Sequence, residues 1–208
     1  MFIVFEGIDG AGTSTQAIRL AEHIQELSKY NDVLLTHEPW NSDEIKDKLA
    51  TDKDAYSDAE RMTKLYIDDR IEHSNKLISP NLDKDVFVIC DRYRMSTEAY
   101  QSTQGMNSVD IIDLQDEAGV LIADITFFIN TSLNEAMKRM KNRGIKKEKF
   151  EDPAFLEELI NKYEECYEIG MRDSRLYGRL KLINGNKPIE FVSNEIFGKF
   201  DDFYFNKN

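Results

Sequence analysis

The 208-residue sequence is poor in cysteine, in long apolar runs and in positive charge, and each shortage argues against a class of protein. Its two cysteines, Cys90 and Cys166, lie far apart and in no C-x-x-C pair. This spacing argues against a disulfide framework and structural zinc, and it predicts a reducing, cytoplasmic compartment. No apolar run approaches the roughly 18 residues of a membrane helix, and no basic stretch precedes the short apolar N-terminal segment. We therefore expect neither a membrane span nor a signal peptide.

The shortage of positive charge leaves a formal net charge of −12. Long nucleic acid is therefore not an expected partner, because its phosphates would be repelled. A small nucleotide can still bind wherever cations gather locally, and one short stretch is basic. It contains Lys138, Arg139, Lys141, Arg143, Lys146, Lys147 and Lys149. Taken alone, such a run more often forms a solvated helix face.

Proline and glycine are also few, with 4 and 10 residues, and they form no linker, so we expect one domain over residues 1–208. Short apolar segments alternate with segments of helical period, and residues 85–90 are apolar without alternation. This pattern is typical of parallel strands that are buried on both faces. The sequence predicts a three-layer α/β/α fold around a central, mostly parallel five-stranded sheet. The expected strands are residues 2–6, 33–36, 85–90, 125–129 and 179–183.

Helices are expected between these strands, and one of them carries a start signal. Ser57 followed by Glu60 forms a capping box, which predicts a long helix from Ser57 to Leu77. The other expected helices are residues 14–29, residues 43–50, most of 94–118, a helix that includes 155–163, and a terminal helix after Pro188.

A glycine-rich turn lies between the first strand and the first helix. It runs Gly7-Ile8-Asp9-Gly10-Ala11-Gly12-Thr13-Ser14-Thr15. In this setting backbone N–H groups converge on an anion, so the turn predicts a phosphate-binding loop in which the Ser14 hydroxyl is placed to bind Mg²⁺. The fit is incomplete, because the usual pattern has lysine where this chain has Thr13. A purely structural glycine turn is the alternative.

A second signal, Asp91-Arg92-Tyr93, ends the buried strand at 85–90. A carboxylate at this place can hold Mg²⁺ through water, and a guanidinium can bind a phosphate with two parallel hydrogen bonds. The alternative for the tripeptide alone is a helix cap with a surface ion pair.

At this point four stretches resemble the thymidylate kinase family. They are Phe5 to Gly12 with Ser14-Thr15-Gln16, then His37-Glu38-Pro39, then Leu65 to Arg70, and then Asp91-Arg92-Tyr93 with Ser96 to Gln101. They occur in the family's order and at its spacing, and they cover residue 2 to about residue 165. The resemblance implies a phosphate-binding-loop kinase that transfers the γ-phosphate of ATP to dTMP with Mg²⁺. It also implies a homodimer.

The resemblance further implies an acceptor site for dTMP. Tyr66 would stack on the thymine ring, and Arg70, one helical turn later, would hydrogen-bond the base. Without the other stretches, a core aromatic is the simpler interpretation of Tyr66. Arg92 would clamp the monophosphate, and Asp9 would lie near the sugar and the acceptor phosphate. The remaining implied substrate residues are Glu38, Thr97, Tyr100 and Gln101.

The donor side is implied in the same way. ATP would contact Gly7, Gly10, Ala11, Gly12, Thr13, Ser14, Thr15 and Arg139. Mg²⁺ would be held by Ser14 and, through water, by Asp91. A lid at about residues 140–152 would close over ATP and carry Arg143, which with Asp9 and Arg92 completes the implied catalytic set.

Two departures from the family pattern keep other functions open. Thr13 replaces the loop lysine; His37 replaces an arginine, and Trp40-Asn41 replaces the usual Gly-Gly. Both losses of charge fall on phosphate sites. They favour either a kinase of the same fold that acts on another deoxynucleotide or nucleoside, or a degenerate nucleotide-binding protein without turnover. Against the latter, the residues Asp9, Ser14, Asp91, Arg92 and Arg143 are all retained.

Overall fold

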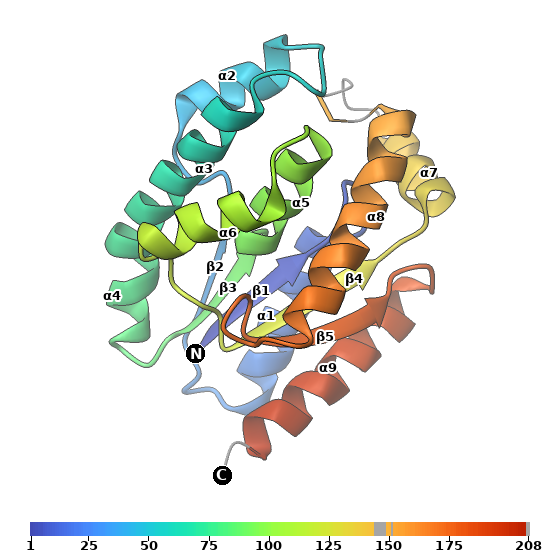
Figure 1. Ribbon diagram of the computed structural model, residues 1–208. Helices are drawn as coiled ribbons and strands as arrows, with labels where there is room; N and C mark the ends of the chain where they lie inside the picture. The colour runs from blue at the N-terminus through green and yellow to red at the C-terminus, as the bar shows by residue number, and fades with distance from the viewer. Residues whose placement is uncertain (144–148, 151, 207–208) are drawn as a thin grey trace.

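A five-stranded sheet in the order β2-β3-β1-β4-β5 forms the centre of the molecule (Figure 1). The computed structural model describes residues 1–143, 149–150 and 152–206, and only the backbone of Arg143. Every strand pairing is parallel. The predicted α/β sheet is therefore confirmed, with strand bounds within two residues of those expected. The strands are β1 (Phe2–Glu6), β2 (Val33–His37), β3 (Phe87–Asp91), β4 (Ile125–Asn130) and β5 (Arg179–Asn184).

Helices cover both faces of the sheet, as the alternation of segments predicts (Figure 1). Helices α1 and α9 pack together on one face, and α3, α5, α6 and α8 form the layer on the other. The helix bounds are α1 (Thr13–Leu27), α2 (Asp43–Thr51), α3 (Ala59–His73), α4 (Ser79–Leu82), α5 (Arg94–Thr103), α6 (Ser108–Glu117), α7 (Leu133–Arg143), α8 (Pro153–Gly170) and α9 (Ile189–Phe205). No helix among the described residues is long and apolar enough to cross a membrane.

The central strand β1 contributes to both hydrophobic layers. Its residues are all buried and alternate between faces, so Ile3 and Phe5 pack in the cluster with α1, while Phe2 and Val4 pack in the cluster with α3. Burial on both faces explains why the segment is apolar without alternation. Only Glu6, at its end, breaks the apolar run.

The predicted capping box at Ser57 is wrong. Helix α3 begins at Ala59, after Asp58 takes a left-handed conformation with φ 59°. The Ser57 hydroxyl donates to Asp52 and to the carbonyl of Asp54 instead of capping the helix. Local polar contacts in the preceding turn have overridden the sequence signal. The helical backbone does continue past Leu77 as expected, because α3 runs through a π-helical turn, η1 (Ser74–Ile78), directly into α4, with Ser74 and Ser79 both in the right-handed helical conformation.

The carboxyl ends of β1 and β3 lie side by side, and they position the site. Phe5 pairs in register with Asp91, so the loop after Glu6 and the turn after Asp91 emerge together. Arg92 turns the chain in a left-handed conformation (φ 70°), which is unusual for a residue with a side chain. In open parallel sheets this edge is where ligands bind.

Candidate active site

The loop after β1 has the backbone shape of an anion site. Gly10 has φ 82°, and a Cβ there would lie 2.5 Å from the carbonyl oxygen of Ala136 in α7. Gly12, with φ 99°, is the N-cap residue of α1 and has no side chain that could cap the helix. The first N–H groups of α1 therefore stay available to an anion at the loop. Glycine is thus required at residue 10 both by conformation and by space.

Ser14 and Asp91 meet beside this loop. The hydroxyl of Ser14, an exposed residue, donates a hydrogen bond to Asp91 Oδ2. The other carboxylate oxygen of Asp91 is buried and has no hydrogen-bond partner among the described residues. An oxygen in that state is a ready ligand for a hard cation or for water on one. The two residues predicted to hold Mg²⁺ therefore form an oxygen pair that fits that role.

Arg92 is held against the loop by several acceptors. Its Nη1 donates to the Gly7 carbonyl at 2.7 Å and to the Tyr100 hydroxyl at 3.1 Å, and its Nη2 donates to Asp9 Oδ1 at 2.6 Å. The Tyr100 hydroxyl in turn donates to Asp9 Oδ2 at 3.2 Å. The guanidinium is therefore fixed in place before any ligand arrives.

A cavity of about 210 Å³ opens beside Arg92. All seven residues predicted to bind the acceptor line it, together with Asp9. The complete lining is Asp9, Glu38, Pro39, Leu49, Tyr66, Arg70, Arg92, Tyr93, Ser96, Thr97, Tyr100, Gln101 and Phe150. We call it the acceptor cavity. His37, which departs from the family pattern, is exposed and is absent from this lining.

Arg70 is fully buried in one wall of the acceptor cavity. Its Nε donates to Glu38 Oε2 at 2.7 Å, Nη1 to Gln115 at 2.8 Å, and Nη2 to the Tyr93 carbonyl and the Thr97 hydroxyl, both at 2.9 Å. These bonds leave one Nη1 proton without a partner among the described residues. The guanidinium is thus rigid, neutralised by Glu38, and able to donate once more.

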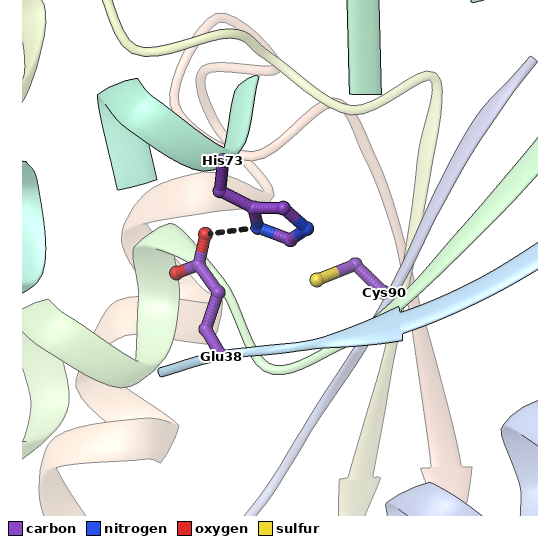
Figure 2. Close-up of side chains that lie close together, drawn as sticks. All are labelled: Glu38, His73 and Cys90. Atoms are coloured by element: carbon purple, nitrogen blue, oxygen red, sulfur yellow. Dashed lines mark hydrogen bonds and ion pairs between the residues drawn. The ribbon is translucent and has the colours of Figure 1, made fainter. Parts of the chain in front are cut away.

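Behind Arg70, three potential metal ligands cluster within 4.8 Å of one another: Glu38, His73 and Cys90 (Figure 2). His73 Nδ1 lies 3.1 Å from Glu38 Oε1, and its Nε2 lies 2.8 Å from the Thr36 hydroxyl. The Cys90 thiol donates to the Arg92 carbonyl, and burial raises its pKa well above the ordinary value. Because each atom already has a partner and Arg70 supplies the positive charge, the cluster supports Arg70 and is poorly suited to a cation.

The Trp40 ring stacks on His73, with centroids 5.2 Å apart and planes 12° from parallel. The backbone N–H groups of Trp40 and Asn41 donate to the Asp69 carboxylate at 2.5 and 2.9 Å. The segment that replaces the family's Gly-Gly is therefore tied to α3. In this chain Trp40 packs on His73, the residue that lies next to Glu38, the ion-pair partner of Arg70.

Gln101 presents an unsatisfied acceptor. Its Nε2 donates to Gln104 at 3.0 Å, while its Oε1 is buried with no partner among the described residues. Tyr66 is half-buried and lines the same cavity, so it is not a fully enclosed core aromatic. The cavity lining thus combines the aromatic ring of Tyr66, the guanidinium of Arg70 and an acceptor oxygen of Gln101 that has no partner among the described residues.

A second, wider cavity of about 570 Å³ lies on the other side of the loop. Arg139 crosses its wall, where it donates to the Ala11 carbonyl at 3.0 Å and the Gly185 carbonyl at 2.8 Å, and pairs with Glu135 at 2.9 Å. Among the predicted ATP residues, Ala11, Gly12, Thr15 and Arg139 line this cavity. Thr13 is buried and lines neither cavity.

The predicted lid, at about residues 140–152, is described only in part. The Arg143 side chain and residues 144–148 and 151 lie outside the described residues. Lys149 and Phe150 are described, and both are buried. Phe150 lines the acceptor cavity, although the sequence placed it in a segment over ATP.

Sequence reasoning missed a buried layer beneath Arg92. Glu6 accepts from the Tyr93 N–H at 2.9 Å and from the Ser96 hydroxyl, and Ser96 lies 2.8 Å from the Tyr163 hydroxyl. Burial raises the pKa of Glu6 to about 7. The one available signal was a carboxylate that ends an otherwise apolar strand beside the glycine loop.

The chain as a whole is similar to known proteins in sequence and in fold. The model of the family "Thymidylate kinase" matches residues 5–196. The "Probable thymidylate kinase" of Thermococcus kodakarensis is 36% identical over 205 residues, covering 94% of this chain and 95% of the relative. The thymidylate kinase of Mycoplasma capricolum is 32% identical over 203 residues, covering 94% and 92%. A crystal structure of thymidylate kinase from Ehrlichia chaffeensis superposes with a TM-score of 0.71 and 29% identity, covering 96% of this chain and 98% of that one. The chain therefore belongs to the thymidylate kinase family.

Proposed function

We propose that this protein transfers the γ-phosphate of ATP to dTMP, giving dTDP and ADP. The observation that carries the proposal is the acceptor cavity, in which groups complementary to a pyrimidine share one small space with the Arg92–Asp9 pair. Phosphoryl transfer needs mainly positioning and charge neutralisation. The arrangement supplies both beside a phosphate-binding loop.

The acceptor cavity supports thymine in particular. The acceptor Gln101 Oε1, which has no partner among the described residues, can receive the N3–H of the base. Arg70 makes four of its five possible donations within the protein, so its fifth N–H can donate to a base carbonyl. The half-buried Tyr66 ring offers a stacking face. A buried site that hydrogen-bonds a ligand strongly rejects bases that leave its groups unpaired. Purine monophosphates, which present a different edge and a larger ring, should therefore be poor acceptors.

Arg92 is the proposed clamp on the acceptor phosphate, and Asp9 holds it in place. The guanidinium can present two parallel N–H groups to phosphate oxygens once the ligand replaces some of its present acceptors. Mg²⁺ would be held by Ser14 and, through water, by Asp91, since the free oxygen of Asp91 fits that role. When bound there, the ion would neutralise charge on the phosphates of ATP.

On the donor side, the loop residues and Arg139 would hold ATP in the wider cavity. Arg139 already donates to the carbonyls of Ala11 and Gly185, which both line that cavity, so it would hold the loop in place as well as contact the nucleotide. Arg143 is proposed to supply the cation that Thr13 does not. We further propose that residues 1–208 form one kinase domain that works as a homodimer in the cytoplasm.

A substrate panel tests the proposal. Purified protein with ATP and Mg²⁺ is offered dTMP, dUMP, dCMP, dAMP, dGMP, the ribonucleotides and free thymidine, and ADP release is followed. We expect dTMP to be the preferred acceptor, with dUMP several-fold weaker, because burying the thymine methyl contributes roughly 1 kcal/mol. Faster turnover of a purine or of a free nucleoside would favour the rival kinase. Absence of turnover with every acceptor would favour a nucleotide-binding protein.

A further inference from the structure

Lys149 belongs to the basic stretch, yet its side chain points into the protein. The side chain has 0% exposure. Its ammonium donates to Asp52 Oδ2, to the Ser57 hydroxyl at 2.7 Å and to the Ser57 carbonyl at 3.3 Å. Its backbone N–H donates to the carbonyl of Leu49 in α2 at 3.2 Å. All of these contacts lie on α2 or on the connection from α2 to α3. The ammonium is therefore paired with this connection.

The connection that receives Lys149 is itself held from the acceptor cavity. Gln104, just after α5, donates to the carbonyls of Ala55 and Ser57 at 2.9 and 2.8 Å. Its own carbonyl accepts from Gln101, which lines the cavity. Asp52 is only a quarter exposed, and the hydrogen bonds from Lys149 and then Ser57 hold its pKa well below the usual range. The connection is therefore a fixed anchor for Lys149.

The consequence of this anchor falls on the next residue. Phe150 is 4% exposed and lines the acceptor cavity beside Leu49. Its ring meets Tyr100 edge to face at 5.0 Å and stacks on Phe155 at 5.1 Å. Tyr100 carries the hydroxyl that contacts both Arg92 and Asp9. Phe150 thus forms a wall of the cavity and backs one of its central residues.

We propose that Lys149 is a positioning residue, which through Asp52 and Ser57 holds Phe150 as a wall of the acceptor cavity and thereby sets acceptor affinity. This deepens the proposed function and rests on it for the identity of the acceptor. The physical reason is that a buried ammonium with three oxygen acceptors fixes the chain at 149–150. Without the ammonium, the backbone bond from residue 149 to Leu49 and the ring contacts of Phe150 remain, and we expect them to hold this wall less firmly.

The central test is Lys149→Met, which keeps an unbranched apolar stem and removes the ammonium. Calorimetry measures the Kd for dTMP, and steady-state kinetics measure KM for dTMP, KM for ATP and kcat. We expect Kd and KM for dTMP to rise about tenfold, with KM for ATP and kcat within about threefold. Lys149→Arg should restore dTMP affinity to within about threefold of the parent, because a guanidinium can reach the same oxygens. The matched control is Lys64→Met, which removes an exposed lysine paired with Glu60 and should change nothing.

Two further variants keep the proposal falsifiable if Lys149→Met folds poorly. Asp52→Asn removes the charge from the partly exposed end of the contact, and it should raise Kd for dTMP about three- to fivefold. Phe150→Leu should weaken dTMP about tenfold, and adding Lys149→Met to it should cost less than a further twofold, because both changes remove the same wall. An additive double variant would overturn the link through Phe150.

Other outcomes separate this inference from the proposed function. A drop in kcat of a hundredfold or more in Lys149→Met, with dTMP affinity unchanged, would overturn it, because Lys149 would then act on the transferred phosphate. Unchanged dTMP binding in both Lys149→Met and Asp52→Asn would overturn it as well. If the parent protein prefers another monophosphate, the proposed function fails, and the same affinity pattern measured with that acceptor still supports the role of Lys149.

Discussion

The carboxylate of Asp9 and the guanidinium of Arg92 form an ion pair, with 2.6 Å between Oδ1 and Nη2. The two side chains are 33% and 18% exposed, so a ligand in the acceptor cavity can reach both. They come from the turns after β1 and β3, which the parallel pairing of Phe5 with Asp91 brings together. Asp9 therefore orients Arg92, the proposed phosphate-binding group, before substrate arrives, which is the condition for effective electrostatic catalysis.

Asp9→Asn should lower kcat by at least tenfold while the protein stays folded. The amide keeps the shape of the side chain but removes the charge that orients Arg92. The measurement is steady-state turnover with dTMP and ATP, beside Asp173→Asn as a control. Asp173 is also 33% exposed and pairs with Arg175 far from the cavity in sequence. A kcat within threefold of the parent would show that Arg92 needs no such orientation.

Tyr100→Ala should narrow the preference for dTMP over its ribonucleotide about tenfold. Tyr100 lines the cavity next to Asp9, and its bulk is proposed to fill the space that a 2′-hydroxyl would need. The quantity to compare is kcat/KM for the two acceptors. Tyr100→Phe keeps the ring and should leave the ratio within about threefold. An unchanged ratio in a folded Tyr100→Ala protein would contradict the steric role.

Asp91→Asn should raise the Mg²⁺ concentration for half-maximal turnover about tenfold or more. The substitution replaces the Asp91 carboxylate with an amide, which has one neutral oxygen and no negative charge, and it leaves the Ser14 hydroxyl in place. Titration of the initial rate with MgCl₂ at saturating nucleotides measures the effect. Ser14→Ala should shift the same curve in the same direction. Mg²⁺ curves that coincide with the parent's would remove these two residues from the metal site.

Glu6 should make stability fall as pH rises from about 4.5 to about 7. Its folded pKa of about 7 lies above the ordinary value of 4.5, so the folded state binds the proton more tightly than the unfolded state does. The resulting stabilisation is complete below the unfolded pKa and is lost as pH rises through the folded pKa, a change of about 3 kcal/mol.

Urea unfolding of the parent and of Glu6→Gln at several pH values isolates this effect, because all other groups titrate in both proteins. The free energy of unfolding of the parent, relative to the variant, should decline across that window and then level off. Parallel pH profiles for the two proteins would mean that Glu6 has no raised pKa.

Arg143→Ala should lower kcat about a hundredfold or more and change KM for ATP much less. The physical reason is that transferring a phosphoryl group between polyanions needs a cation where charge develops, and Thr13 offers none. Thr13→Lys should recover part of the lost rate in the Arg143→Ala background. If kcat of Arg143→Ala stays within about threefold of the parent value, Arg143 is not the cation that replaces the missing loop lysine.

The sequence alone determined the sheet and the phosphate loop, because both depend on local patterns. A strand buried on both faces must be apolar throughout, as residues 2–5 and 87–90 are. A turn with positive φ and no room for a Cβ must use glycine, as Gly10 does. The capping box at Ser57 failed for the same kind of reason, since another local partner, Asp52, competes for the hydroxyl.

The tertiary structure alone decided which polar groups are free and which are occupied. From the sequence, Lys149 is one of several cations in a basic stretch. In the fold its side chain is buried against Asp52, and Phe150 lines the acceptor cavity. Arg70 was expected to serve the base, and only the fold showed how many of its protons Glu38, Gln115 and Thr97 already take. The physical reason is that a hydrogen bond or an ion pair depends on atoms that meet within about 3 Å, and residues 27 to 97 positions apart meet only when the chain has folded.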